Sequence, residues 1–245
     1  MTGLSVGQRV GFGTAAGGAY AEGVNLPASI LAPVPGGVSD EQAAAVLLQG
    51  MTAHYLAYSA FSLSAGHLAV VHAAAGGVGG LLVQLARRTG ARVLATAGSA
   101  WKLELARELG AQLTASYEDF GGLARQHGGA DVIYDGVGKT TFAAGLDALK
   151  LRGLMCLYGA ASGAPDPIDP QLLNAKGGLY LTRPSLSHYT QTAEELRWRA
   201  GELFDLLRSG DLLVRIDRVF PLAKVQDAHR YIEGRNTLGK VLIGM

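Results

Sequence analysis

A glycine-rich turn in the first half of the chain constrains the fold most. The turn reads AAAGGVG at 73–79 and fits the pattern G-x-G-x-x-G, with Ala74 in the place of the first glycine. The nearly continuous apolar run 69–73, typical of a strand buried on both faces, precedes it. A helix-like segment then continues to Arg88. A strand, a glycine turn and a helix in this order predict the first unit of a parallel α/β sheet.

Each glycine of this pattern has a physical role. A glycine at position 76 lets the backbone approach a pyrophosphate, and a glycine at position 79 lets the helix pack closely on the strand. The N–H groups of the first helical turn, together with the helix dipole, attract phosphate. The turn therefore predicts that a dinucleotide is bound through its pyrophosphate by Ala75, Gly76, Gly77, Val78 and Gly79.

Five more strand-like runs follow the turn and alternate with amphipathic segments. Two of the intervening helices, 76–88 and 101–109, are followed by glycines, Gly90 and Gly110, that suit a helix end. Six strands predict an α/β fold with a doubly wound parallel Rossmann sheet of order 3-2-1-4-5-6. The five later strands are expected at 92–97, 113–116, 131–134, 154–158 and 179–181.

The two ends of the chain have a different pattern. Residues 6–35 are rich in Gly and Pro and lack helical periodicity, which predicts part of a β-domain. Ser39 and Gln42 have capping-box spacing and predict the start of an apolar helix. A long amphipathic helix is expected over 194–209. It is followed by a strand, a helix and a last strand at 215–220, 222–233 and 240–243.

The residues after the second strand indicate which dinucleotide is bound. Enzymes that use NAD place Asp or Glu there to bind the ribose 2′-hydroxyl, but this chain reads AGSAWK at 97–102. Ser99 could donate a hydrogen bond to a 2′-phosphate and Lys102 could neutralise it, which favours NADPH. Alternatively, Ser99 only caps the second helix and Lys102 is a solvated charge.

Composition argues against several other classes of protein. The 21 basic and 20 acidic residues give a net charge of +1, which offers no broad basic surface for nucleic acid or an anionic membrane. No apolar run reaches the roughly 18 residues that span a bilayer. The N-terminus lacks the layout of a signal peptide. Cys156 is the only cysteine and the six histidines are scattered, so we expect no disulfide, no metal site and a cytoplasmic location.

Longer motifs carry a resemblance to a known family. They are VHAAAGGVG at 71–79, GA at 110–111, YDGVG at 134–138, RGLM at 152–155, TRPSL at 182–186, SDEQAAA at 39–45 and GMTA at 50–53. Together they resemble the quinone oxidoreductases, the zeta-crystallin-like, zinc-independent branch of the medium-chain dehydrogenase/reductases, from about Val6 to the C-terminus. The resemblance implies an NADPH:quinone oxidoreductase. It also implies a Rossmann domain at 48–184 and a partial GroES-like β-barrel domain built from 1–47 and 185–245.

The resemblance also implies further cofactor contacts outside the glycine turn. For three of them a structural alternative stays open: Tyr117 as a surface aromatic, Arg183 as a hydrogen-bonding residue before Pro184, and Arg235 as a loop charge. Tyr117 would lie beside the adenosine phosphate, and 181–183 near the nicotinamide. The implied residues are Thr52, Gly98, Ser99, Lys102, Tyr117, Tyr158, Gly159, Ala160, Leu181, Thr182, Arg183 and Arg235.

Hydride transfer depends on how the cofactor is oriented toward the acceptor rather than on a strong general base, because the cofactor supplies the reacting group. Asp135, His54 and His188 are therefore interpreted as core or surface residues, and no proton donor is assigned. Three functions stay open: an NADPH:quinone reductase, a related enoyl or enone reductase, and a truncated, non-catalytic NADPH-binding remnant.

Two expectations about the whole protein follow from the resemblance. Members of this branch begin with a further stretch that forms most of the barrel, whereas Val6 to Val10 of this chain match a strand in the middle of the barrel. This difference motivates the third function. Members also pair through the sixth Rossmann strand, so we expect a homodimer through 179–181.

Overall fold

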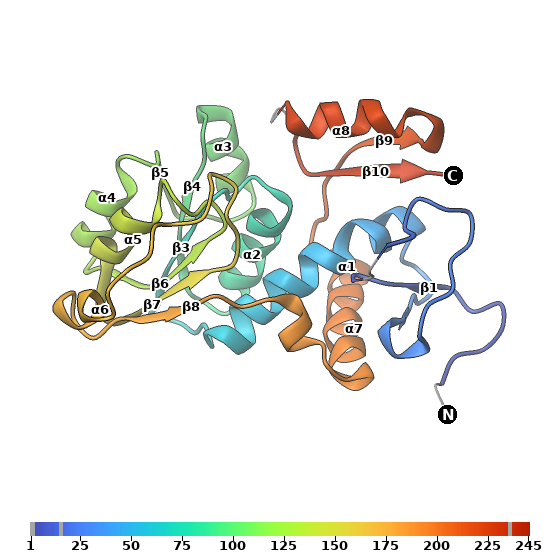
Figure 1. The fold of residues 1–245 in the computed structure, drawn as a ribbon, viewed down its shortest axis with the longest axis horizontal. Coiled ribbons are helices and arrows are strands. Elements are labelled where there is room, and N and C mark those ends of the chain that lie inside the picture. The colour runs from blue at the N-terminus through green and yellow to red at the C-terminus, as the bar shows by residue number, and fades with distance from the viewer. Residues whose placement is uncertain (1–2, 15–16, 235–236) are drawn as a thin grey trace. The chain divides into compact units, whose positions relative to one another are not determined.

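A six-stranded parallel sheet organises the unit Ala53–Ser185, one of two units in the computed structural model (Figure 1). The structure describes residues 3–14, 17–234 and 237–245. The sheet has the order β5-β4-β3-β6-β7-β8, so the predicted Rossmann order 3-2-1-4-5-6 is confirmed. Its strands are β3 Leu68–Val71, β4 Arg92–Thr96, β5 Leu113–Ala115, β6 Ala130–Asp135, β7 Leu149–Leu157 and β8 Tyr180–Thr182.

Strands β4 and β5 are added on one side of β3, and β6, β7 and β8 on the other side. Because the crossovers in both halves are right-handed, their helices cover opposite faces of the sheet. Helices α2 (Gly77–Arg88) and α3 (Ala100–Glu108) connect β3 to β4 and β4 to β5. On the other face, α4 (Phe120–Gln126) and α5 (Phe142–Ala148) lie together (Figure 1). Their apolar side chains form one buried cluster with the sheet, and each fully buried Leu or Phe contributes roughly 1.5–3 kcal/mol. The short α6 (Gln171–Ala175) precedes β8.

The predicted element ends agree with the structure to within two residues, except at the start of β7 and at the start of the helix predicted at 222–233. This strand begins at Leu149, five residues before the predicted start at 154. Residues 150–152 of this strand are all exposed, and Arg152 adopts a left-handed backbone (φ 59°). The continuous buried run that indicates a strand in the sequence therefore begins only after Arg152. The predicted helix 222–233 also begins differently, with a 3₁₀ turn at Leu222–Lys224 before α8 (Val225–Glu233).

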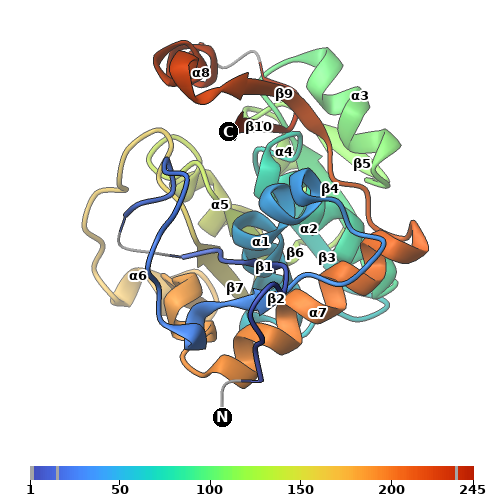
Figure 2. The same ribbon diagram turned by 90° about the vertical axis from the view of Figure 1, so that its right-hand side faces the viewer.

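The second unit, Met1–Thr52 with Leu186–Met245, combines strands and helices from both chain ends. Among its described residues, β1 (Val10–Gly11) pairs with β2 (Ala32–Pro33), and β9 (Ile216–Pro221) pairs in parallel with β10 (Lys240–Gly244) through α8. The predicted amphipathic helix is α7 (Ala193–Ser209), which runs beside β2 (Figure 2). The remaining 3₁₀ turns are Ala28–Ile30 and Leu186–Tyr189.

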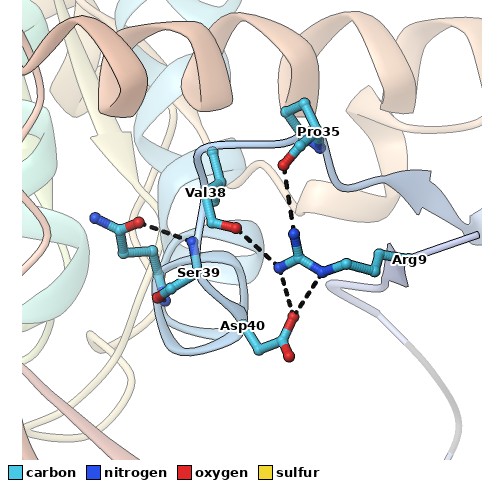
Figure 3. A network of polar contacts seen from close by, with 6 residues as sticks. Arg9, Pro35, Val38, Ser39 and Asp40 are labelled. Atoms are coloured by element: carbon cyan, nitrogen blue, oxygen red, sulfur yellow. Dashed lines mark hydrogen bonds and ion pairs between the residues drawn. The ribbon is translucent and has the colours of Figure 1, made fainter.

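The helix α1 (Asp40–Tyr55) begins at two sets of polar contacts (Figure 3). Arg9 donates from Nε to Asp40 Oδ1 at 3.0 Å and from Nη2 to the Val38 carbonyl at 2.8 Å. Ser39 and Gln42 form the predicted capping box, with bonds of 2.9 and 3.1 Å. Because exposed ion pairs contribute at most about 1 kcal/mol, the cap and the bond to the carbonyl carry much of this anchoring. The division between the two units falls within α1, after Thr52.

No helix in the described part of the chain combines the length and the apolar character needed to cross a bilayer.

Candidate cofactor-binding site

The turn between β3 and α2 is closed by short backbone bonds. The Gly76 N–H donates to the Ala73 carbonyl at 2.8 Å, and the Ala74 N–H donates to the Thr96 carbonyl at the end of β4 at 3.0 Å. At Gly79 a Cβ atom would lie only 2.8 Å from the Ala74 Cα atom and would also collide with the Ala73 carbonyl oxygen. Only glycine at this position lets α2 begin so close to β3, as the pattern predicts.

The same turn leaves an exposed approach to the backbone. Gly76 is exposed, whereas Ala74 and Ala75 are buried beneath it. Gly76 precedes the first residue of α2 with extended backbone angles (φ −79°, ψ 173°). The first N–H groups of a helix have no partner inside the helix, and the helix dipole makes this end positive. The cradle, defined here as residues 73–79, therefore fits a phosphate group.

Three predicted residues follow β4, the strand beside β3. The Ser99 side chain makes no capping bond to α3, and its buried Oγ atom has no hydrogen-bond partner among the described residues. The Lys102 ammonium lies 5.0 Å from the centre of the Trp101 ring, one turn into α3. Gly98 is exposed, with open space where a side chain would be. A buried hydroxyl without a partner is costly, and a phosphate oxygen would satisfy it. This part of the site thus fits a 2′-phosphate.

Tyr117, which follows β5, lies against the cradle. Burial raises the pKa of Tyr117 above its usual value, although the nearby Ala73 backbone and Thr96 side chain act to lower this pKa. His72, the residue just before the cradle, was not predicted as a site residue. It is fully buried, its Nδ1 lies 2.8 Å from Thr96 Oγ1, and its ring packs edge-on against Phe120 at 4.6 Å. Its position between a strand and a glycine turn was the only available sequence signal.

The loops after β6 and β7 pack directly on each other. Asp135 is fully buried and accepts from the N–H groups of Val137 (2.7 Å) and Gly138 (2.9 Å) and from the Thr141 hydroxyl (2.8 Å). These three bonds confirm the interpretation of Asp135 as a core residue. They also show that its carboxylate stabilises the loop after β6. A Cβ atom at Gly159 would lie 2.9 Å from the Gly136 Cα atom, so the two loops touch through glycines.

Tyr158 and Arg183 join these loops to β8. A Cβ atom at Gly136 would lie 2.8 Å from the Tyr158 hydroxyl oxygen, so the phenol covers that glycine. Burial, the largest cause, raises the pKa of Tyr158 well above its usual value. Arg183 Nη1 donates to the Tyr158 carbonyl at 3.0 Å and to the Pro184 carbonyl at 3.1 Å. The structure therefore brings two predicted groups together, 158–160 and 181–183, and it supports the structural alternative for Arg183.

Most of the predicted site residues thus belong to one edge of one sheet. The cradle follows β3, Ser99 follows β4, Tyr117 follows β5, Tyr158 follows β7 and Arg183 follows β8. The carboxyl ends of parallel strands form the ligand-binding edge of such sheets. The structure does not assign two further predicted residues to this group. Thr52 is assigned to the other unit, where its hydroxyl donates to the Leu48 carbonyl at 2.8 Å, and Arg235 lies outside the described residues.

Other candidate side chains have structural surroundings. His54 is buried, with its ring 4.8 Å from that of Tyr58, and His188 is exposed. Within residues 3–14, 17–234 and 237–245, no cluster of three or more His, Cys, Asp or Glu side chains could hold a metal ion. The predicted independence from zinc stays a prediction.

An α/β chain with a phosphate cradle at the carboxyl edge of a Rossmann sheet is a dinucleotide-binding protein of the dehydrogenase/reductase class. A family model described as zinc-binding dehydrogenase matches residues 77–198. A quinone oxidoreductase of Pseudomonas aeruginosa is 38% identical, over 99% of this chain and 76% of that protein. A 2-haloacrylate reductase of a Burkholderia species is also 38% identical, over 99% of this chain and 75% of that protein.

A solved structure agrees with these relatives. The quinone oxidoreductase of Escherichia coli complexed with NADPH has a TM-score of 0.94 and 37% identity, covering 98% of this chain and 76% of that one. This chain therefore spans about three quarters of the length of the proteins compared. The chain belongs to the quinone oxidoreductase family of the medium-chain dehydrogenase/reductases, as the motifs indicated.

The buried His72 predicts a loss of stability in acid. Burial lowers the pKa of His72 from 6.5 to about 4, although the carboxylate of Asp135 opposes the shift. As the pH falls from 6.5 to about 4, the unfolded chain therefore binds one more proton than the folded chain. The free energy of unfolding falls with it, by roughly 3 kcal/mol in total. In urea titrations between about pH 7 and pH 4, His72→Gln should show a shallower fall than the parent. Parallel curves for the two proteins would contradict the assignment.

The cradle predicts that Gly76→Val weakens binding of the cofactor more than it destabilises the fold. The new Cβ atom would lie 3.1 Å from the Ala73 carbonyl, and valine is tolerated at φ −79°, so we expect a stability loss of only about 1 kcal/mol. Blocking the pyrophosphate should cost roughly tenfold to a hundredfold in affinity, measured by calorimetry with NADPH. Gly201→Val is the matched control, since nothing lies within 4 Å of its new Cβ atom. Unchanged affinity in a folded Gly76→Val variant would refute the cradle.

Proposed function

We propose that this protein is an NADPH-dependent reductase of quinones. The proposal is carried by the buried Ser99 hydroxyl, which has no hydrogen-bond partner among the described residues. It lies beside an exposed phosphate cradle, and Lys102 follows it in the first turn of α3. No acidic residue stands at 97–102, where an enzyme specific for NAD would bind its ribose. Relatives named quinone oxidoreductase, and the NADPH complex of one of them, support the same function.

The chain's own residues would bind the cofactor at two phosphates. The N–H groups at the start of α2 would donate to the pyrophosphate, and Ser99 and Lys102 would hold the 2′-phosphate. Tyr117 would border the adenosine end, since it already contacts Ala73. Bound in this way, NADPH supplies a hydride to an acceptor. The protein fixes the distance between donor and acceptor and excludes water.

We propose that the interlocked loops after β6, β7 and β8 support the nicotinamide end. Asp135 holds one loop through three hydrogen bonds, and Arg183 ties the next loop to β8. Such bracing suits a wall that must keep a ring in place while hydride leaves it. Thr52 and Arg235 remain proposed cofactor contacts, as do Gly98 and the residues 159–160 and 181–182. The division into 1–47, 48–184 and 185–245 remains our proposal for the domains.

A reductase of conjugated carbon–carbon double bonds is the second candidate, because a 2-haloacrylate reductase is among the relatives. Both activities use the same cofactor site, so only the acceptor distinguishes them. We further propose that the reaction needs no zinc and takes place in the cytoplasm. The buried Cys156 is the chain's only cysteine, which suits a reducing compartment.

The proposed function is tested by following the oxidation of NADPH and NADH with a panel of quinones and a panel of enones and 2-haloacrylates. We expect quinones to be the better acceptors. We expect NADPH to be preferred over NADH by roughly tenfold to a hundredfold, the value of hydrogen bonds to a charged phosphate. Lys102→Gln should lose most of this preference. Arg107→Gln, on the same helix and paired with Glu104, should keep it. Equal use of the two cofactors, or turnover with alkenes alone, would refute the proposal.

We also propose a homodimer formed through β8. In the described chain β8 pairs only with β7 and is the last strand of the sheet. Tyr180 is 62% exposed and Leu181 38% exposed, so an apolar strand edge faces outward. Such an edge tends to pair with another strand, and a second copy is the occupant that a two-fold axis provides.

The dimer is tested by light scattering at tens of micromolar protein. The parent should have twice the chain mass of 25.4 kDa, and Tyr180→Lys should have the mass of one chain because a charge blocks the edge. Tyr20→Lys, at an exposed tyrosine in the other unit, should stay dimeric. A parent that is monomeric at every concentration would contradict the proposal.

A further inference from the structure

Thr96, the last residue of β4, contacts the cradle through both its backbone and its side chain. Its carbonyl accepts from the Ala74 N–H at 3.0 Å. Its hydroxyl lies 2.8 Å from His72 Nδ1. The Thr96 side chain also lies beside Tyr117, whose pKa it helps to lower. Both Thr96 and His72 are fully buried. These contacts involve the residues immediately before and after Ala73, together with Tyr117 from the predicted site.

Ala73 itself has an unusual backbone. Its φ angle is 52°, in the left-handed region that residues other than glycine rarely adopt. Such a conformation persists where the surrounding bonds over-determine it. Here the His72 backbone N–H donates to the Tyr134 carbonyl at 3.1 Å on one side of Ala73. On the other side, the Ala74 N–H donates to the Thr96 carbonyl.

The direction of the Ala73 carbonyl decides where α2 begins. That carbonyl accepts from the Gly76 N–H at 2.8 Å and occupies the space beside Gly79. Rotating the peptide at Ala73 would therefore break the turn and move the first N–H groups of the helix. The imidazole of His72 points to the same conclusion. Within the described structure its Nε2 atom is buried without a hydrogen-bond partner. The side-chain hydrogen bond of the ring is therefore the one between Nδ1 and the Thr96 hydroxyl.

We propose that Thr96, braced by His72, is a positioning residue for the phosphate cradle. The Thr96 hydroxyl and carbonyl lock Ala73 in its left-handed conformation, which aims the N–H groups of α2 at the pyrophosphate before the cofactor arrives. The proposal rests on the proposed NADPH site. It adds a residue pair that acts on both NADPH and NADH, since the pyrophosphate is common to them, whereas Ser99 and Lys102 act on NADPH alone.

The test compares four threonine and histidine variants by calorimetry with NADPH and with NADH. Thr96→Val removes the hydroxyl at nearly constant shape and should weaken both affinities by roughly tenfold, leaving their ratio unchanged. Thr96→Ser keeps a hydroxyl and should recover to within a few-fold of the parent. His72→Gln should weaken both affinities in the same direction as Thr96→Val.

Thr114→Val is the matched control. Thr114 lies on the neighbouring strand, opposite Ala95, and its buried Oγ1 atom lacks a hydrogen-bond partner in the described chain. This variant should bind both cofactors as the parent does. Lys102→Gln, by contrast, should lower the affinity for NADPH alone.

Each outcome separates this inference from the proposed function. If the parent binds neither cofactor, the proposed cofactor site fails, and the inference fails with it. If the parent binds NADPH but a folded Thr96→Val binds equally well, the positioning role alone is refuted. It is also refuted if Thr96→Ser is as weak as Thr96→Val, because the hydroxyl would then not be the active group. Should Thr96→Val not fold, His72→Gln with unchanged affinities would refute it.

Discussion

The close approach of α2 to β3 at the cradle is the constraint on which the site depends. A side chain at position 79 would collide with the carbonyl of Ala73, so α2 can begin here only if residue 79 in its first turn is glycine. Its N–H groups are thereby presented at the end of the central strand, where a parallel sheet gathers every strand's carboxyl end. Ser99 and Tyr117 reach the same edge because β4 and β5 are the next strands in order.

The strands and the cradle could be predicted because both depend on local sequence, and the sheet order then followed from the topology of doubly wound sheets. Apolar runs, helix-ending glycines and the capping box at Ser39 each report on a few neighbouring residues. The features that sequence reasoning missed depend on contacts between distant residues. His72 bonds to a threonine 24 residues away, and the left-handed backbone is at an alanine, where composition gives no sign of it. The early start of β7 was missed because Arg152 interrupts its pattern.

The predicted site residues divide by the kind of support they now have. The cradle and Ser99 have geometry that fits phosphate, including a buried hydroxyl that has no partner in the described part of the chain. Arg183 has a bond that braces one loop against another, so its effect on the cofactor would be through the position of 158–160. Thr52 and Arg235 rest on the family resemblance alone, since position 235 lies outside the described structure and Thr52 belongs to the other unit.

A crystal structure of this protein with NADPH bound would test the central claim most directly. The account predicts pyrophosphate oxygens within hydrogen-bonding distance, about 2.7–3.2 Å, of the N–H groups at the start of α2. It also predicts the 2′-phosphate against Ser99 and Lys102, with Ala73 still in its left-handed conformation. A pyrophosphate bound away from the residues 73–79, or an adenosine ribose with its phosphate turned from Ser99, would contradict it.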